Sequence, residues 1–170
     1  MTAPASPALP ASLKANPRLS RWIGIHANGT VSVRSGKVDL GQGISTALAQ
    51  IAADGLGVAL WRIRMVPAST VVSPNEGVTS GSLSVQESGS ALRQVCREVR
   101  QIYLRAAAVQ LGLTQEDLQS LTLQDGEIST PRSARLPPTW MPVPPWPEAI
   151  FLAIATASSI GIRSEEHTSE

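Results

Sequence analysis

Two short polar segments of this sequence have the residue types and spacing to bind an anion. The first is the turn of Gly41, Gln42 and Gly43, which joins an extended segment to a helical one. Glycines at such a turn expose the backbone N–H groups of the first helical turn, because no Cβ atom keeps a ligand away. The Gln42 amide can both donate and accept at the tip. The same pattern is typical of a tight turn that binds nothing, so the turn alone does not establish a site.

The second segment ends a long polar loop and precedes the next helical stretch. It consists of six consecutive residues, Thr79, Ser80, Gly81, Ser82, Leu83 and Ser84. Hydroxyl and N–H groups at a helix N-terminus bind phosphate through hydrogen bonds that the helix dipole strengthens. Alternatively, Ser82 or Ser84 serves only as the N-cap of that helix. Two such segments in one small domain favour a ligand-binding function.

Apolar periodicity predicts an α+β fold that would position these segments. The expected elements are a β-hairpin over residues 22–34 turning at Asn28-Gly29, a helix over 44–53 ended by Gly55 and Gly57, a strand over 61–66, a long helix over 84–112 and a short hairpin at Asp125-Gly126. Helical stripes are expected at Ile44, Ala47, Leu48, Ile51 and Ala52, and at Leu92, Val95, Val99, Ile102, Ala106 and Val109. In the strand, Trp61, Ile63 and Met65 are expected to face the core.

Composition excludes several classes of protein. The chain has 170 residues and a formal net charge of +1, with scattered basic residues, which argues against a nucleic-acid partner. Its one cysteine, Cys96, cannot form an intrachain disulfide and is expected in the core. Residues 1–12 are expected to form a flexible arm and not a secretory leader, so the protein is expected to be cytoplasmic. The apolar run over residues 151–162 is too short to span a membrane.

The residues of the two segments resemble a known family. The run from Gly36 through Gly43 with Thr46 and Gln50, followed by the segment Thr79 to Ser84 and by Ala91-Leu-Arg-Gln-Val-Cys, is similar to the molybdopterin-binding large subunit of the xanthine dehydrogenase and aldehyde oxidase family. The nicotinate dehydrogenase and isoquinoline 1-oxidoreductase branch is the most similar. The resemblance covers about residues 13–130, which would form part of a larger molybdopterin-binding domain.

The resemblance implies a cofactor, partners and a reaction. Gln42, with Gly41 and Gly43, would lie against the pterin, and the segment Thr79 to Ser84 would hold the phosphate end of a molybdenum-molybdopterin cofactor, in its cytosine dinucleotide form. Iron–sulfur clusters would reside on a small partner subunit. The full-length enzyme would oxidise an N-heterocycle or an aldehyde with oxygen taken from water. No residue here matches the family's catalytic glutamate, and Glu76 and Glu87 are expected to be solvated. Gly55, where relatives carry an acidic residue, is expected only to weaken its helix.

The character of the sequence changes after Thr130. Residues 131–162 crowd prolines beside tryptophans and are predicted to be a frameshifted tail, and residues 163–170 can be back-translated into a common sequencing adapter. The chain alone is therefore expected to be an inactive fragment whose apolar helical stripes lack packing partners. The alternative is a non-catalytic α+β module that binds an anionic small molecule or a protein partner.

Overall fold

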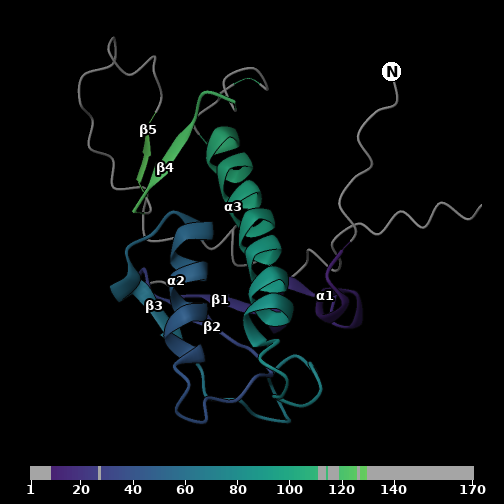
Figure 1. Ribbon diagram of the computed structural model, residues 1–170. Coiled ribbons are helices and arrows are strands. Elements are labelled where there is room, and N and C mark those ends of the chain that lie inside the picture. The colour runs from purple at the N-terminus through teal and green to yellow at the C-terminus, as the bar shows by residue number, and fades with distance from the viewer. Residues whose placement is uncertain (1–8, 27, 111–113, 115–118, 126, 130–170) are drawn as a thin grey trace, which may run out of the picture.

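The computed structural model describes residues 9–26, 28–110, 114, 119–125 and 127–129 (Figure 1). The tail segments predicted at 131–162 and 163–170 lie outside these residues. The described part combines helices with a small mixed sheet, which confirms the α+β prediction. Helix α1 (Ala11–Ala15) begins within the segment predicted as an arm, and its Ser12 and Leu13 are buried.

A three-stranded sheet forms one layer, with the order β1 (Ile23–Ile25), β2 (Val31–Val33) and β3 (Ile63–Met65). Strands β1 and β2 are antiparallel, as the predicted hairpin requires, and the Asn28 side chain closes the turn by accepting hydrogen bonds from Thr30. Strand β3 runs parallel to β2. A parallel pair needs a crossover connection, and helix α2 (Ile44–Leu56) supplies it. A second sheet pairs β4 (Thr122–Gln124) with β5 (Glu127–Ser129), which confirms the short hairpin.

Helices α2 and α3 (Ser90–Gln110) lie side by side over the sheet with their N-terminal ends at the same end of the molecule (Figure 1). Their apolar residues join those of the sheet in one core, in which Leu48, Leu56, Leu92 and Val95 are almost fully buried. The expectation that the two helical stripes lack partners is wrong, because the stripes cover each other and the sheet.

Three details of the predicted helices and strands are wrong. The long helix begins with a π-helical turn, η3 (Val85–Gly89). Its apolar seam is buried at Leu92, Val95 and Val99 as predicted, but Val109 is 80% exposed and Tyr103 is buried instead. The residues before β3 form a short 3-10 helix, η2 (Leu60–Arg62), which turns Trp61 outward onto the Arg62 guanidinium.

Gly55 does not end its helix. Helix α2 continues through it to Leu56, and Gly57, with a φ of 70°, forms the left-handed C-cap. A Cβ atom at Gly55 would lie 2.7 Å from the Cβ of Cys96 on α3. Gly55 therefore allows the close approach of the two helices, and the prediction that it only weakens its own helix is wrong.

Cys96 lies in the core, as the sequence predicts, and burial raises the pKa of its thiol to about 12. Because the thiolate is the reactive form, we expect native Cys96 to resist a thiol reagent such as iodoacetamide at pH 8 and to react rapidly in denaturant. Mass spectrometry of the alkylated chain checks this. Equal labelling rates in buffer and in denaturant would contradict the buried position.

Candidate functional site

The two polar segments meet at the loop end of the molecule, where α2 and η3 begin (lower part of Figure 1). They line one open pocket of about 400 Å³. One wall includes Leu40, Gln42 and Gly43, and the other includes Thr79, Ser80, Gly81, Ser82 and Ser84. Two predicted site residues, Gly41 and Leu83, belong to these loops but do not line the pocket. The fold thus brings together segments that are about forty residues apart in the sequence.

The glycine turn is organised by Asp39, which the sequence analysis missed. Strand β2 ends at Val33, and the described residues 34–43 that follow it contain no further strand. The Asp39 carboxylate accepts hydrogen bonds from the N–H groups of Gly41, Gly43 and Ser45. Three of the backbone donors expected to be free for an anion are therefore already bound within the chain. The hydrogen bonds from Ser45 and then Gly41 lower the pKa of Asp39. The sequence did contain a signal for this role, because an acidic residue shortly before a helix start often accepts hydrogen bonds from the first N–H groups of the helix.

Gln42 also bonds within its own turn. Its Oε1 accepts a hydrogen bond from the Leu40 N–H, and its Nε2 donates to the Val38 carbonyl at 2.9 Å. Gly43 is in the left-handed region with a φ of 73°, and apart from its chain neighbours no described residue has an atom within 4 Å of the position that a Cβ would take. The turn is held in place by its own side chains and presents an open backbone face to the pocket. The contact between Gln42 and a pterin stays a prediction.

The hydroxyl-rich wall has an unusual backbone. Gly81 and Ser82 are consecutive left-handed residues, with φ values of 65° and 57°. Ser84 stands at the N-cap position of η3, but its side chain makes no capping hydrogen bond. The Thr79 hydroxyl accepts a hydrogen bond from the Val38 N–H at 2.9 Å, which joins the two loops directly.

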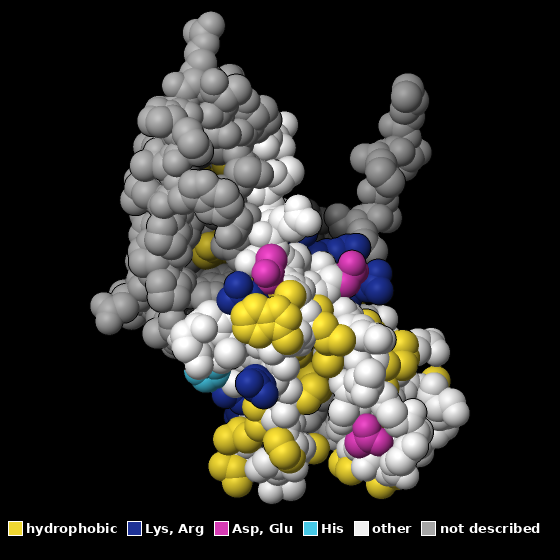
Figure 2. Space-filling view, turned by 90° about the vertical axis from the view of Figure 1, so that its left-hand side faces the viewer, with side chains coloured by type: hydrophobic (Ala, Val, Ile, Leu, Met, Phe, Trp, Pro, Cys, Tyr) yellow, Lys and Arg dark blue, Asp and Glu magenta, His cyan; other side chains and the backbone are white. Residues whose placement is uncertain are grey.

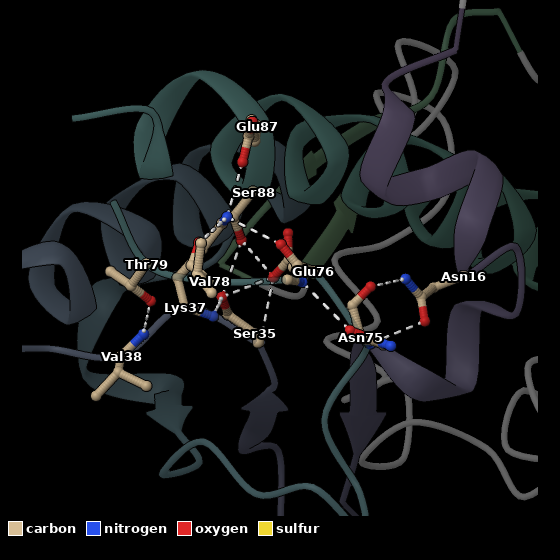
Figure 3. A network of polar contacts seen from close by, with 12 residues as sticks. Asn16, Ser35, Lys37, Val38, Asn75, Glu76, Val78, Thr79, Glu87 and Ser88 are labelled. Carbon is tan, nitrogen blue, oxygen red and sulfur yellow. Dashed lines mark hydrogen bonds and ion pairs between the residues drawn. The ribbon is translucent and has the colours of Figure 1, made fainter. Parts of the chain in front are cut away.

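A buried lysine holds the second loop against the first (Figure 3). The Lys37 side chain is only 2% exposed, and its ammonium group donates to the carbonyl oxygens of Glu76 and Val78, both at 3.0 Å. It also forms an ion pair of 2.7 Å with the Glu87 carboxylate on η3. The second loop and η3 therefore converge on one charged group of the first loop.

The Glu76 carboxylate completes this network. Its Oε2 accepts hydrogen bonds from the Ser35 hydroxyl, the Gly36 N–H and the Ser88 hydroxyl, at 2.7–3.0 Å. Its Oε1 is buried and has no hydrogen-bond partner among the described residues. The expectation of solvation is wrong for Glu76, whose carboxylate is bound in this network, whereas the Glu87 side chain is 39% exposed and is also paired with Lys37. The sequence shows the charges but not their pairing.

The described ranges contain no group of three or more His, Cys, Asp or Glu residues that could hold a metal ion. Among the helices that the structure describes, none has the length and apolar character needed to cross a membrane.

The Asp39 contacts predict a pH dependence of stability. Because the folded pKa is depressed, the carboxylate contributes stability above the ordinary Asp pKa, and the contribution is lost as the pH falls through the folded value. Asp39→Asn is therefore expected to unfold more easily than the parent chain at pH 7, and the difference should narrow below about pH 4. Urea unfolding across this range checks it. A difference that does not change with pH would show that the charge plays no part.

The chain is similar to known molybdenum enzymes. A family model described as a molybdopterin cofactor-binding domain matches residues 4–165, which include residues 131–162. A nicotinate dehydrogenase subunit of Pseudomonas putida is 36% identical over 110 residues, which are 65% of this chain and 9% of that protein. Xanthine dehydrogenase 1 of Arabidopsis thaliana is 32% identical over 77 residues, which are 45% of this chain and 6% of that protein.

Solved structures agree with the sequence relatives. The Cu,Mo-CO dehydrogenase superimposes with a TM-score of 0.57 at 29% identity, and the match covers 64% of this chain and 13% of that chain. Quinoline 2-oxidoreductase from Pseudomonas putida 86 superimposes with a TM-score of 0.51 at 26% identity and has the same coverage. The chain spans less than a tenth of the two sequence relatives named above. The extent of the family match shows that the chain belongs to the molybdopterin cofactor-binding domains of the xanthine dehydrogenase and aldehyde oxidase family.

Proposed function

We propose that this chain forms one wall of the molybdopterin site in a larger molybdenum hydroxylase. The observation that carries the proposal is the shared pocket, because it places Gln42 and Gly43 opposite the hydroxyl-rich segment from Thr79 to Ser84. None of the described residues that line this pocket is acidic. A pocket wall without carboxylates and with several hydroxyls suits an anionic ligand.

The residues present fit two parts of such a cofactor. The hydroxyls of Ser80, Ser82 and Ser84 would bind the phosphate end, since hydroxyls can donate to its oxygens. The open backbone at Gly43 and the Gln42 amide would lie against the edge of the pterin. Asp39 already binds the N–H groups of Gly41, Gly43 and Ser45, so the phosphate is assigned to the second loop. When bound, the cofactor supplies the redox chemistry, and the chain holds and orients it.

The loop end carries exposed apolar side chains, at Leu40, Val78, Leu83 and Val85 among others. Hydrophobic side chains gather at the lower end of the face drawn in Figure 2. Several exposed apolar side chains at one end of a domain are typical of an interface. We take the cofactor and the remaining domains of the enzyme to cover this end, and the chain on its own to be catalytically inactive.

For the whole enzyme, the proposal is oxidation of an N-heterocycle or an aldehyde with oxygen from water. The names of two relatives, a nicotinate dehydrogenase and a quinoline oxidoreductase, support the heterocycle. A relative that is itself one subunit of an enzyme supports a partner, which we propose to be an iron–sulfur protein in the cytoplasm. The cytosine dinucleotide form of the cofactor belongs to the same proposal.

The test changes the charge at Ser82 in the full-length enzyme that contains this chain. Ser82→Asp places a carboxylate in the pocket, whereas Ser82→Asn is neutral and of the same size, and both residues tolerate the left-handed backbone found there. We expect the aspartate variant to lose about tenfold in bound molybdenum and pterin, a change of about 1.4 kcal/mol. The asparagine variant should retain most of both.

Metal analysis and fluorescence of the oxidised pterin measure the outcome. Thermal unfolding of the two variants without cofactor controls for folding. Equal cofactor content in the two variants would remove the basis for placing the phosphate at this loop.

A further inference from the structure

A groove lined by arginines lies at the other end of α2, away from the cofactor pocket. It has a volume of about 780 Å³ and runs between α3, the end of α2 and the residues just before β4. Its lining includes Arg93, Arg97, Arg100 and Arg105. Among the described residues of the lining, Asp54 is the only acidic one. The groove therefore has a strong positive charge although the whole chain is almost neutral.

These arginines are not neutralised within the described chain. The two ion pairs found there are Lys37 with Glu87 and Arg62 with Asp125, and neither involves the groove. Arg93, Arg97 and Arg105 are exposed, and Arg100 makes one long contact of 3.4 Å with the Leu123 carbonyl. Like charges at positions i, i+4 and i+7 of a helix repel one another. An anionic partner would relieve this repulsion.

We propose that the arginine groove binds an acidic, extended segment of a partner polypeptide. Arg93 to Arg105 cover about 18 Å along the helix axis, at 1.5 Å per residue. A free phosphate or a small carboxylate can contact only a fraction of that length. Arg93 and Arg97 are about 6 Å apart along the axis, close to the spacing of about 7 Å between alternate side chains of an extended strand.

The chemistry of recognition follows from the guanidinium group. Its planar set of donors pairs with a carboxylate through two parallel hydrogen bonds, which favours carboxylates presented in a row. The buried Leu104 and Leu121, which also line the groove, give it an apolar floor for the aliphatic part of glutamate side chains. The proposal is independent of the cofactor site.

The probe is a fluorescein-labelled peptide of about twelve residues with alternating glutamate and serine, which spans the groove at about 3.3 Å per residue. Its glutamine counterpart is the uncharged control. Fluorescence anisotropy with the full chain should show binding of the glutamate peptide and none of the glutamine peptide. The binding should weaken as salt is raised from about 0.05 to about 0.5 M.

Two charge-reversal variants locate the interaction. Arg93→Glu with Arg97→Glu should weaken peptide binding at least about tenfold, a change of about 1.4 kcal/mol. Arg18→Glu with Arg21→Glu changes the net charge equally at exposed positions outside the groove and should bind like the parent. Arg93→Gln with Arg97→Gln is a milder groove variant in case the reversal disturbs folding, which circular dichroism monitors.

Three results would overturn the proposal. One is the absence of any binding of the glutamate peptide. Another is an equal loss in the groove and control variants, which would indicate attraction by net charge alone. The third is tighter binding of a single-stranded oligonucleotide with the same number of charges, which would assign the groove to nucleic acid.

Discussion

Replacing Lys37 with methionine is expected to lower the free energy of unfolding by about 2–4 kcal/mol, the range for leaving several buried polar groups without their donor. The substitution keeps the length of the side chain but removes the ammonium group. The carbonyl oxygens of Glu76 and Val78 then lose their donor, and Glu87 loses its ion pair. Because Glu87 is 39% exposed, water compensates part of its loss, and the two carbonyls account for much of the effect.

Glu87→Gln is the matched control, since it removes one charge and keeps an acceptor for Lys37. Its cost should be no more than about 1 kcal/mol, as for a partly exposed ion pair. Denaturant unfolding of the three chains gives the free energies. A Lys37→Met chain as stable as the parent would show that the loop is held by other contacts. In the full-length enzyme the same variant should also lose cofactor, because the loop that lines the pocket is released.

Gly55→Ala is expected to destabilise the chain by about 1–3 kcal/mol, the usual cost of adding a methyl group to a packed core. Helix propensity alone predicts the opposite effect on stability, because replacing glycine with alanine inside a helix stabilises it by about 0.5–1 kcal/mol. The contact decides which effect is larger, because the new Cβ would lie 2.7 Å from the Cβ of Cys96. Helices α2 and α3 would have to move apart.

A compensating change tests this reason. In the double variant Gly55→Ala with Cys96→Gly, a Cβ atom is added at position 55 and the Cβ atom that it would meet at position 96 is removed, so the close approach is restored. The loss in the free energy of unfolding of the double variant should therefore be smaller than the sum of the losses in the two single variants, by about 1 kcal/mol or more. Cys96→Gly alone measures the cost of a glycine in α3. Additive effects would show that the Gly55 contact is not the cause.

The parts of the fold predicted from the sequence are those set by local patterns. The hairpin at Asn28-Gly29 follows from turn residues that accept a left-handed backbone, and Gly29 has a φ of 78°. Helix α2 follows from its apolar periodicity, and Ile44, Leu48 and Ala52 are buried as expected. Such features depend on neighbours within a few residues, so the sequence contains their cause.

The errors came from contacts between distant segments. The outward position of Trp61 depends on the 3-10 helix before β3. Asp125, more than sixty residues further along, accepts hydrogen bonds from the Ala59 N–H and the Arg62 side chain at this turn. The role of Gly55 depends on Cys96, forty-one residues further along, and no local rule reports that distance. Helix propensity describes Gly55 only as a weak helix former, whereas in the packed structure Gly55 is where helices α2 and α3 approach each other closely.

For the candidate site, the sequence determined the chemical groups, and the tertiary structure decided their use. The glycine turn and the hydroxyl-rich segment were recognisable because their residue types state what they can bind. The structure placed them on one pocket, and it assigned the free backbone donors to Asp39 and the loop carbonyls to Lys37. A buried charge must find partners wherever the fold provides them, since isolation from water is costly. That requirement acts through space, so only the folded chain shows that Lys37 and Glu76 join the two loops that form the pocket.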